Sequence, residues 1–540
     1  GNIDVDGTTN LDAVDIDGAV DMASTLAVGG AATLSSGGTV SGSEILYFRD
    51  SAIYIRSTTD GQLDLVADTE IEITATTIDI NGAINASGEI IAASLDISGN
   101  VDIDGTLETD AFSINGTTVS STAAELNVLD PALKEINSIY IGSDPSGTTD
   151  TGSSYNVAIG VNALDAVTTS GYNTAVGAEA LGKTTTGDLN VAYGYKALTE
   201  STVGDRNTAV GYEALRDVEP ASKTDMYNVA LGFKAGTNAS AGTDFTGIQN
   251  VLLGSFAGAE ITSGAYNSAV GHNAGGGGSG SAATGNYNSA LGYASLQNTT
   301  SASNNVAVGG FSMQVNTTGR ENIAVGYQTL DANLTGNRNA AVGHQALTAM
   351  NPSGDVDTYN SAFGYRALAV LSTGTINTAV GHGALENATT SSRNTAVGGA
   401  SLQVTTTGYN NVGVGASSLQ QNTEGYANVS IGYQAMTLTT TGVNNVAVGE
   451  NALRTNVDDH GSVAVGYRSL YSANNTASAG YVYNIAMGFQ SGYSVSTGKE
   501  NIFIGGNAGQ DTVPLTTGNY NVVVGTDCRT SAADSANQIV

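Results

Sequence analysis

A five-residue motif returns along most of this 540-residue chain at a nearly constant interval. Asn156-Val-Ala-Ile-Gly160 reappears as Asn173-Thr-Ala-Val-Gly177, and the last copy is Asn521-Val-Val-Val-Gly525. Of the 20 intervals between the 21 copies, 14 are 17 residues long and six are 20, 21 or 22. A period this short does not fit a string of globular domains. It predicts a solenoid with short insertions in one loop of the coil.

Each position of the unit, counted from its Asn, accepts few residue types. Position five is Gly in all 21 copies, which predicts a positive φ or a close backbone approach there. Position one is Asn in 20 copies, with Ser462 as the exception. Coils about 4.8 Å apart would let the Asn amides hydrogen-bond in a ladder. The expected ladder and glycine column include Asn173, Gly177, Asn207, Gly211, Asn322, Gly326, Asn377, Gly381, Asn445 and Gly449.

The apolar positions predict how one coil is built. Position four is apolar in every copy, and an Ala-Leu pair such as Ala214-Leu215 follows four residues later. We therefore expect a short strand, a Gly turn, a second short strand and a Thr/Ser/Gly-rich return. Position three is Ala in 16 copies and faces opposite to positions two and four on a strand. Because a 17-residue coil holds few large apolar side chains, we interpret this Ala column as packing against other copies. We expect a homotrimer about 100 Å long in this part.

The repeat unit resembles the left-handed β-roll head of trimeric autotransporter adhesins, which has a slightly shorter period. The resemblance covers residues 156–525, where Asn-x-Ala-Val-Gly and the following Ala recur. It implies an architecture, not a role, because similar rolls are also used in viral fibres.

Residues 1–120 carry a different pattern, which alternates apolar and acidic residues and turns at Gly. Val14-Asp-Ile-Asp-Gly18, Val101-Asp-Ile-Asp-Gly105 and the run from Leu63 to Ile80 are examples. Period two predicts strands with one buried and one wet face, and three intertwined or stacked chains would fit. The stretch resembles the β shafts of bacteriophage tail fibres and spikes. The motif Asp-x-Asp-Gly is only part of a calcium loop, so no metal site is predicted.

A short helical joint is expected over residues 121–139, before a β-roll domain over 140–540. Thr122 and Glu125 form a capping-box pattern, and Pro131 would open a second helical turn. The stretch from Thr122 to Asp130 resembles a short motif common in phage tail fibres and related virion proteins. Gly often follows the Asp in that motif, and Pro131 takes its place here.

Charge and composition exclude several classes of function. The net charge of −32 leaves no basic face for a nucleic acid and disfavours an anionic membrane surface. The lone Cys528 excludes a disulfide framework and a cysteine metal cage. No apolar run of about 18 residues is present, so we expect no membrane insertion in this segment. The sequence stops at Val540 within an expected strand, and we expect further chain.

Candidate chemistry is sparse, and no catalytic residue, cofactor site or metal site is predicted. His272, His344 and His382 share position six with a set of tyrosines. A ring type that recurs at one position is interpreted as a stacking stripe. The alternative is a carbohydrate-binding stripe, whose candidate receptor contacts are Tyr195, Tyr212, Tyr293, Tyr327, Tyr365, Tyr433 and Tyr467.

These observations predict an all-β, trimeric, non-enzymatic fibre with a β shaft, a helical joint and a β-roll of about 21 coils. The leading hypothesis is an extracellular virion appendage, such as a phage tail fibre, for host attachment. Its partners would be its own copies, other virion or tail proteins, and a host surface glycan or protein. A bacterial trimeric surface adhesin is the main alternative. A glycan-cleaving tailspike would need clustered carboxylates, which the sequence does not show. We expect the roll to act as a spacer.

Overall fold

The computed structural model divides the chain into two units, residues 1–109 and residues 110–540. It describes residues 45–47, 54–56, most of 63–87, 112–114, 117–119 and 138–142, and then 154–540 apart from 239–243, 277–279, 475–479 and 511–515. The expected helical joint, except its last two residues, and most of the expected shaft lie outside these residues. Within the described ranges, all regular structure is β-structure.

Short antiparallel strands occupy the described part of the expected shaft. β1 (Ile45–Tyr47), β2 (Tyr54–Arg56) and β3 (Asp64–Val66) form a three-stranded sheet. β4 (Phe112–Ile114) and β5 (Thr117–Val119) form a hairpin in the second unit. The alternating run beyond β3 forms no strand where it is described, and its isoleucines, such as Ile71 and Ile73, are about half exposed.

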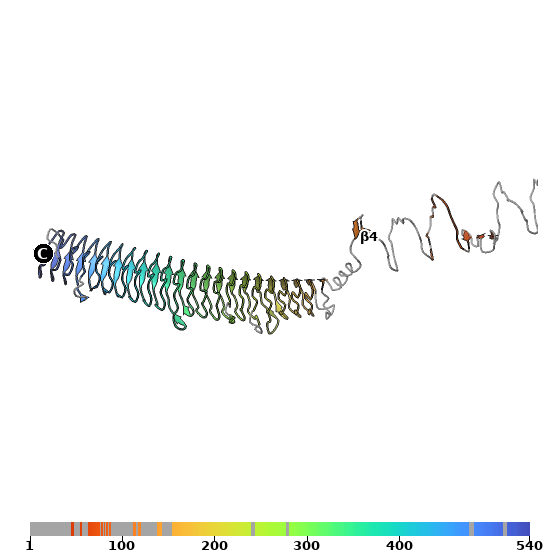
Figure 1. Cartoon of the computed structure of the whole chain (residues 1–540), viewed down its shortest axis with the longest axis horizontal. Coiled ribbons are helices and arrows are strands. Elements are labelled where there is room, and N and C mark those ends of the chain that lie inside the picture. The colour runs from red at the N-terminus through yellow and green to blue at the C-terminus, as the bar shows by residue number, and fades with distance from the viewer. Residues whose placement is uncertain are drawn as a thin grey trace, which may run out of the picture. The chain divides into compact units, whose positions relative to one another are not determined.

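The expected solenoid is confirmed as one parallel sheet of 22 three-residue strands, stacked in chain order (Figure 1). Equivalent positions lie side by side, so Ala192 sits between Ala175 and Ala209. The first strand lies outside the 21 copies of the motif, because its coil has Ser138 at position one and Tyr140 at position three. The strands are β6 (Ile139–Ile141), β7 (Val157–Ile159), β8 (Thr174–Val176), β9 (Val191–Tyr193), β11 (Thr208–Val210), β13 (Val229–Leu231), β14 (Val251–Leu253), β15 (Ser268–Val270), β16 (Ser289–Leu291), β17 (Val306–Val308), β18 (Ile323–Val325), β20 (Ala340–Val342), β22 (Ser361–Phe363), β23 (Thr378–Val380), β24 (Thr395–Val397), β25 (Val412–Val414), β26 (Val429–Ile431), β27 (Val446–Val448), β29 (Val463–Val465), β31 (Ile485–Met487), β32 (Ile502–Ile504) and β33 (Val522–Val524).

The Ala column at position three forms the interior of the coil, so its assignment to a contact between copies is wrong. Ala175, Ala192 and Ala209 are all fully buried within the single chain. Alternation along the strand then turns positions two and four outward, and Val191 and Tyr193 are 38% and 59% exposed. In most coils position three holds only a methyl group, because the buried Leu side chains of the turns fill the rest of the interior.

The expected second strand is also wrong, because the Ala-Leu pair lies in a tight turn. Ala214 and Leu215 are fully buried, and Leu215 has a φ of 47°. The backbone N–H of Leu215 donates to the carbonyl oxygen of Ala235 in the next coil at 2.9 Å. A left-handed residue other than Gly costs about 1–2 kcal/mol, and burial of the Leu side chain offsets that cost.

Larger core side chains are matched by glycines in the adjoining turns. Leu252 replaces the usual Ala at position three, and Gly258 replaces the usual Leu at position nine. A Cβ on Gly258 would lie closer than a normal contact to Leu252 Cδ2, and a Cβ on Gly236 would lie 2.9 Å from Leu252 Cδ1. Phe503 is accommodated by Gly492 and Gly509 in the same way. The core is therefore filled by summed volume across neighbouring coils.

The Asn side chains form a buried ladder along the stack. Asn156 Oδ1 accepts the backbone N–H of Asn173, and Asn173 Oδ1 accepts that of Asn190, each at 2.9 Å. Asn173 Nδ2 donates to the carbonyl oxygen of Gly187 in the return segment, also at 2.9 Å. Each amide thus joins the strand of its own coil to the neighbouring strand and to the return segment of its own coil. All these Asn side chains are buried, so their polar atoms need such partners.

The position-five glycines satisfy both conditions expected of them. Gly177 has a φ of 130°, and Gly326 has a φ of 138°. A Cβ on Gly177 would lie 2.6 Å from the carbonyl oxygen of Gly194 in the next coil. The backbones of successive coils therefore approach too closely for any side chain.

Candidate functional surfaces

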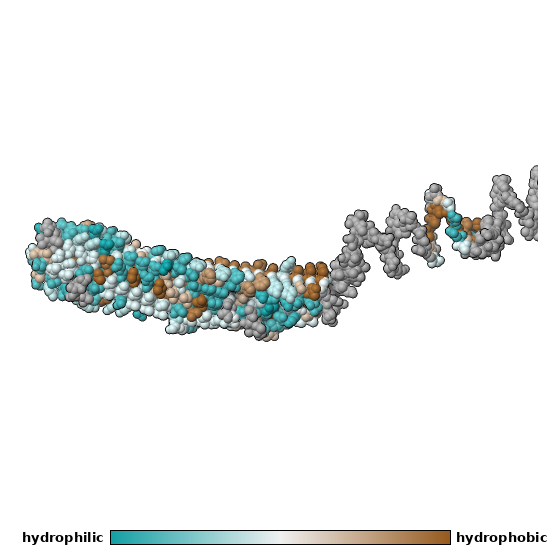
Figure 2. Space-filling view, in the orientation of Figure 1, coloured by the Kyte–Doolittle hydropathy of each residue, from teal (hydrophilic) through white to brown (hydrophobic). Residues whose placement is uncertain are grey.

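The outward face of the parallel sheet carries a continuous apolar band at position four, beside a mixed row of Val, Ile, Ala, Thr and Ser at position two. Position four contributes an apolar side chain in every repeat, and Figure 2 shows hydrophobic residues in a row along one edge of the N-terminal part of the solenoid. Twenty-two strands at about 4.8 Å, each about 10 Å long, give a face of about 1,000 Å². The more exposed position-four side chains are Ile159, Tyr193, Leu231, Leu291, Phe363, Ile431, Met487, Ile504 and Val524.

Faces of this kind are normally covered by other parts of a protein or by a partner. Parallel sheets are normally covered on both faces, and a typical monomer exposes apolar patches of only about 300–600 Å². The inner face of this sheet is covered by the coil's own Leu turns, while the outer face is bare in the single chain. Positions two and four, not position three, are the surface available for packing against another chain.

The position-six tyrosines lie in a column of rings. Tyr327, His344, Tyr365 and His382 follow one another at centroid distances of 5.2–5.4 Å, with planes 5–26° apart. Phenylalanines at position seven extend the contacts edge-on, and Tyr467 stacks on Phe489 at 5.2 Å. Successive ring contacts join Tyr195, Tyr212, Phe233, Phe256, His272, Tyr293, Phe311, Tyr327, His344, Tyr365 and His382.

This stacking decides which parts of the rings a ligand can reach. Tyr327 and Tyr365 are 45% and 46% exposed, but both faces of Tyr365 are covered by His344 and His382. Sugar rings bind aromatic faces, so a stacked column offers them only ring edges and hydroxyl groups. Tyr433 is 52% exposed and has no ring neighbour among the residues that the structure describes. The receptor role of these tyrosines stays a prediction, and Tyr433 is its best candidate.

Three insertions run beside the return segment of the preceding coil, and we call them straps. Each contains a two-residue strand that pairs in parallel with that return: β12 (Thr224–Asp225) with β10 (Gly204–Asp205), β21 (Val356–Asp357) with β19 (Gly336–Asn337), and β30 (Gly480–Tyr481) with β28 (Asp459–His460). The first strap spans residues 219–227 and the second 351–359. The third is described over residues 480–483. The described residues of these insertions therefore belong to the coil stack.

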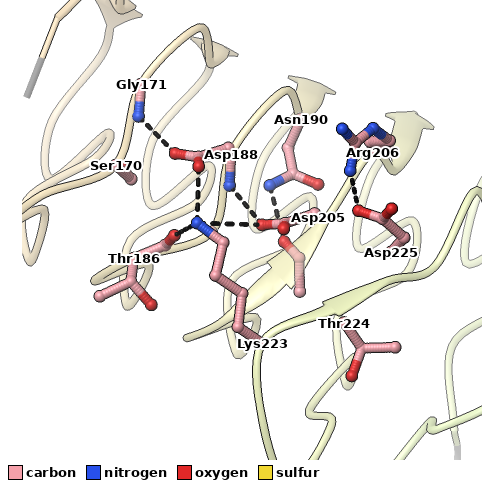
Figure 3. Close-up of polar contacts among 12 residues, drawn as sticks. Ser170, Gly171, Thr186, Asp188, Asn190, Asp205, Arg206, Lys223, Thr224 and Asp225 are labelled. Carbon is pink, nitrogen blue, oxygen red and sulfur yellow. Dashed lines mark hydrogen bonds and ion pairs between the residues drawn. The ribbon is translucent and has the colours of Figure 1, made fainter.

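The first strap is held by ion pairs across three coils (Figure 3). Lys223 Nζ donates to Asp188 Oδ2 at 2.6 Å and to the carbonyl oxygen of Thr186 at 2.9 Å. Asp205 Oδ1 lies 3.9 Å from the same ammonium group. On the far side of the strap, Arg206 forms an ion pair with Asp225.

A second ladder, which sequence reasoning missed, runs beside these ion pairs. Asp188 Oδ1 accepts the N–H of Gly171 at 2.7 Å, and Asp205 Oδ1 accepts the N–H of Asp188 at 2.6 Å. Asn337 Oδ1 and His460 Nδ1 accept the equivalent N–H groups of Arg320 and Val443. The acceptor always lies two residues before the ladder position, but its type varies among Asp, Asn, Ser and His. A position filled by four residue types gives no signal in a single sequence.

Burial of Asp205 has an electrostatic consequence. Burial raises the pKa of the Asp205 carboxyl above its ordinary value, while the N–H of Asp188 and the charge of Lys223 act in the opposite direction. The ionised Asp205 carboxylate therefore lowers the stability of the folded strap at neutral pH.

The part of the chain that the structure describes contains no cluster of three or more His, Cys, Asp or Glu side chains placed to hold a metal ion. Over the same residues, no helix is long and apolar enough to cross a membrane. No protein-family model matches this chain, and no curated protein matches it. The function therefore has to be argued from the surfaces described above.

Proposed function

We propose that this chain is the structural subunit of a homotrimeric, extracellular virion fibre that projects from the particle for host-cell attachment. The observation that carries the proposal is the bare apolar face of the parallel sheet. Three copies around an axis parallel to the solenoid would bury that face of each copy and keep the strap side outward. The product would be a long, acidic rod without an enzymatic site.

Three copies fit this face better than two. The sheet is only three residues wide, so three narrow faces can meet at a common axis with side chains filling the space between them. Each pair of copies would share part of the band, whose total area of about 1,000 Å² exceeds the roughly 800 Å² per partner of a standard interface. The net charge of −32 would limit side-by-side association of finished rods.

The roll is best suited to be a spacer within this fibre. Its coils repeat the same surface, and its rings cover one another's faces rather than lining a pocket. Receptor contact and the connection to the particle would then lie in other parts of the fibre or in other virion proteins. The resemblance of the repeat unit to adhesin heads supports a bacterial trimeric surface adhesin as the second candidate.

The location of the protein tests the proposal. Antibodies raised against residues 154–540 should label appendages of purified virions in electron micrographs and should reduce adsorption of those virions to host cells. Labelling of the bacterial envelope in cells that produce no particles would favour the adhesin. Labelling of neither structure would overturn both candidates.

A further inference from the structure

The three straps occur at a fixed interval in the stack. They belong to the coils that begin at Asn207, Asn339 and Ser462, so each strap occurs seven coils after the one before it. The first two share the pattern Pro-x-x-x-x-Asp-x-Tyr-Asn, from Pro220 to Asn228 and from Pro352 to Asn360. The stack therefore has a longer repeat of seven coils superimposed on the 17-residue unit.

The first two straps carry the same ion pair with its charges exchanged. Lys223 pairs with Asp188 at 2.6 Å, whereas Asp355, at the equivalent place, pairs with Arg320 at 3.1 Å. Both pairs join residues 35 apart and connect the strap to the return two coils earlier. Asp205 lies beside the first pair, and the uncharged Asn337 lies at its place in the second, where it donates to Asp355 at 2.6 Å.

The third strap carries neither arrangement of this ion pair. The residues at the corresponding places in the sequence are Val443 and Ala479, and both are uncharged. Its described contact with the return two coils earlier is neutral, since Asn444 Nδ2 donates to the Tyr481 hydroxyl at 3.4 Å. Three equivalent straps therefore carry three different electrostatic patterns.

Stability alone does not explain this difference. The side chains of both pairs are between 31% and 50% exposed, and ion pairs at such sites contribute little to the free energy of folding. Either polarity would serve equally well if local stabilisation were the only role. The result would be different if each strap lay against the return segment that belongs to the other strap, because like charges would then meet. Lys223 would meet Arg320, and Asp355 would meet both Asp188 and the buried Asp205.

We propose that the straps are register markers, which allow each seven-coil segment to stack only on its own neighbours. The coils of this chain are nearly interchangeable in sequence, so a slipped stack would keep the Asn ladder and the Gly column. Slippage within one chain, or exchange of segments between copies, is a recognised failure of repeat proteins. Repulsion between a strap and the return that belongs to the other strap disfavours those arrangements and leaves the native one unaffected.

Making two straps alike tests the proposal. A uniform variant carries the second pattern in both places, while an exchanged variant swaps the two patterns and keeps them different. The uniform variant is Asp188→Arg, Asp205→Asn and Lys223→Asp, and the exchanged variant adds Arg320→Asp, Asn337→Asp and Asp355→Lys. Every strap in both variants keeps an ion pair of opposite charges.

The readout is recovery of the native assembly of the full chain after dilution from denaturant, together with its thermal midpoint. We expect both variants to melt close to the parent protein. The uniform variant should give a several-fold lower native yield and more misassembled species, whereas the exchanged variant should refold like the parent. Failure of the uniform variant to form at all, with the exchanged variant intact, would have the same meaning. Equal recovery of all three proteins, or equal loss in both variants, would overturn the proposal.

Discussion

The glycine column shows that the absence of a Cβ atom at position five allows the close spacing of the coils. Gly326 combines a φ of 138° with a position where a Cβ would collide with the carbonyl oxygen of Gly343 in the next coil. That oxygen belongs to the backbone, so no side-chain rotation can relieve the contact. Both conditions could be inferred from an invariant Gly in the sequence.

We expect Gly326→Ala to lower the free energy of unfolding by about 3 kcal/mol or more, because it adds backbone strain to a collision. Gly354→Ala is the matched control, since Gly354 also has a positive φ, of 90°, but nothing lies within 4 Å of its Cβ position. Denaturant unfolding of both variants measures the difference. Equal losses would show that the close approach of the coils is not what requires glycine at position five.

Other left-handed residues could not be predicted, because they are not glycines. Tyr172, Lys196 and Leu215 have φ values of 61°, 56° and 47°, and equivalent residues recur in coil after coil. None of these residue types favours that conformation, so the local sequence gives no indication of it. The closure of a 17-residue coil imposes it through tertiary packing and hydrogen bonds between coils.

Asp205 gives a pH-dependent prediction at the same scale. An acid whose pKa is raised on folding binds its proton more tightly in the native state, so its contribution to stability falls as pH rises from about 4 towards neutrality. Asp205→Asn removes this cost and keeps an oxygen that can accept the Asp188 N–H, as Asn337 does for Arg320. Its thermal midpoint should equal or exceed that of the parent at pH 7, and the advantage should shrink towards pH 4. A variant that is less stable at pH 7 would mean that the ion pair with Lys223 outweighs the burial of Asp205.

At the scale of the coil, the period, the Asn ladder and the glycine turn follow from the sequence. Which side chains of the strand face the interior does not. Ala at position three and Val at position four are both apolar, and alternation alone does not say which of them faces inward. The structure places Ala209 inside and Val210 outside, because the interior is too narrow for a branched side chain beside the Leu turn. The Ala-Leu segment was predicted as a strand because two adjacent apolar residues fit a strand as well as a turn. The ambiguity between positions three and four led to the wrong assignment of the Ala column to a contact between copies.

Volume exchange within the core is testable in the coil of Leu252. Leu252→Ala should cost about 2–5 kcal/mol of unfolding free energy, because it opens a cavity beside Gly258. Adding Gly258→Leu restores the Ala and Leu arrangement of the other coils and should recover much of that loss. Gly258→Leu alone should destabilise, since its side chain would overlap Leu252. Losses in the two single variants that simply add in the double variant would contradict shared filling of the core.

At the scale of the whole molecule, the long parallel sheet has one face that the single chain leaves exposed. Its inner face is closed by its own turns, and its outer face carries apolar residues at position four throughout. The sequence predicts an assembly of copies, but the Ala column that was assigned to the contact is buried inside the coil. The proposed spacer role depends on this assembly, since a rod of single chains would expose the band along its full length.

The mass of the folded full-length chain in solution tests this account most directly. Light scattering coupled to size-exclusion chromatography should give three times the chain mass of 54.2 kDa for an elongated particle. Circular dichroism on the same fraction establishes that the particle is folded β-structure. A stable, folded particle with the mass of one or two chains would contradict burial of the sheet face by three copies.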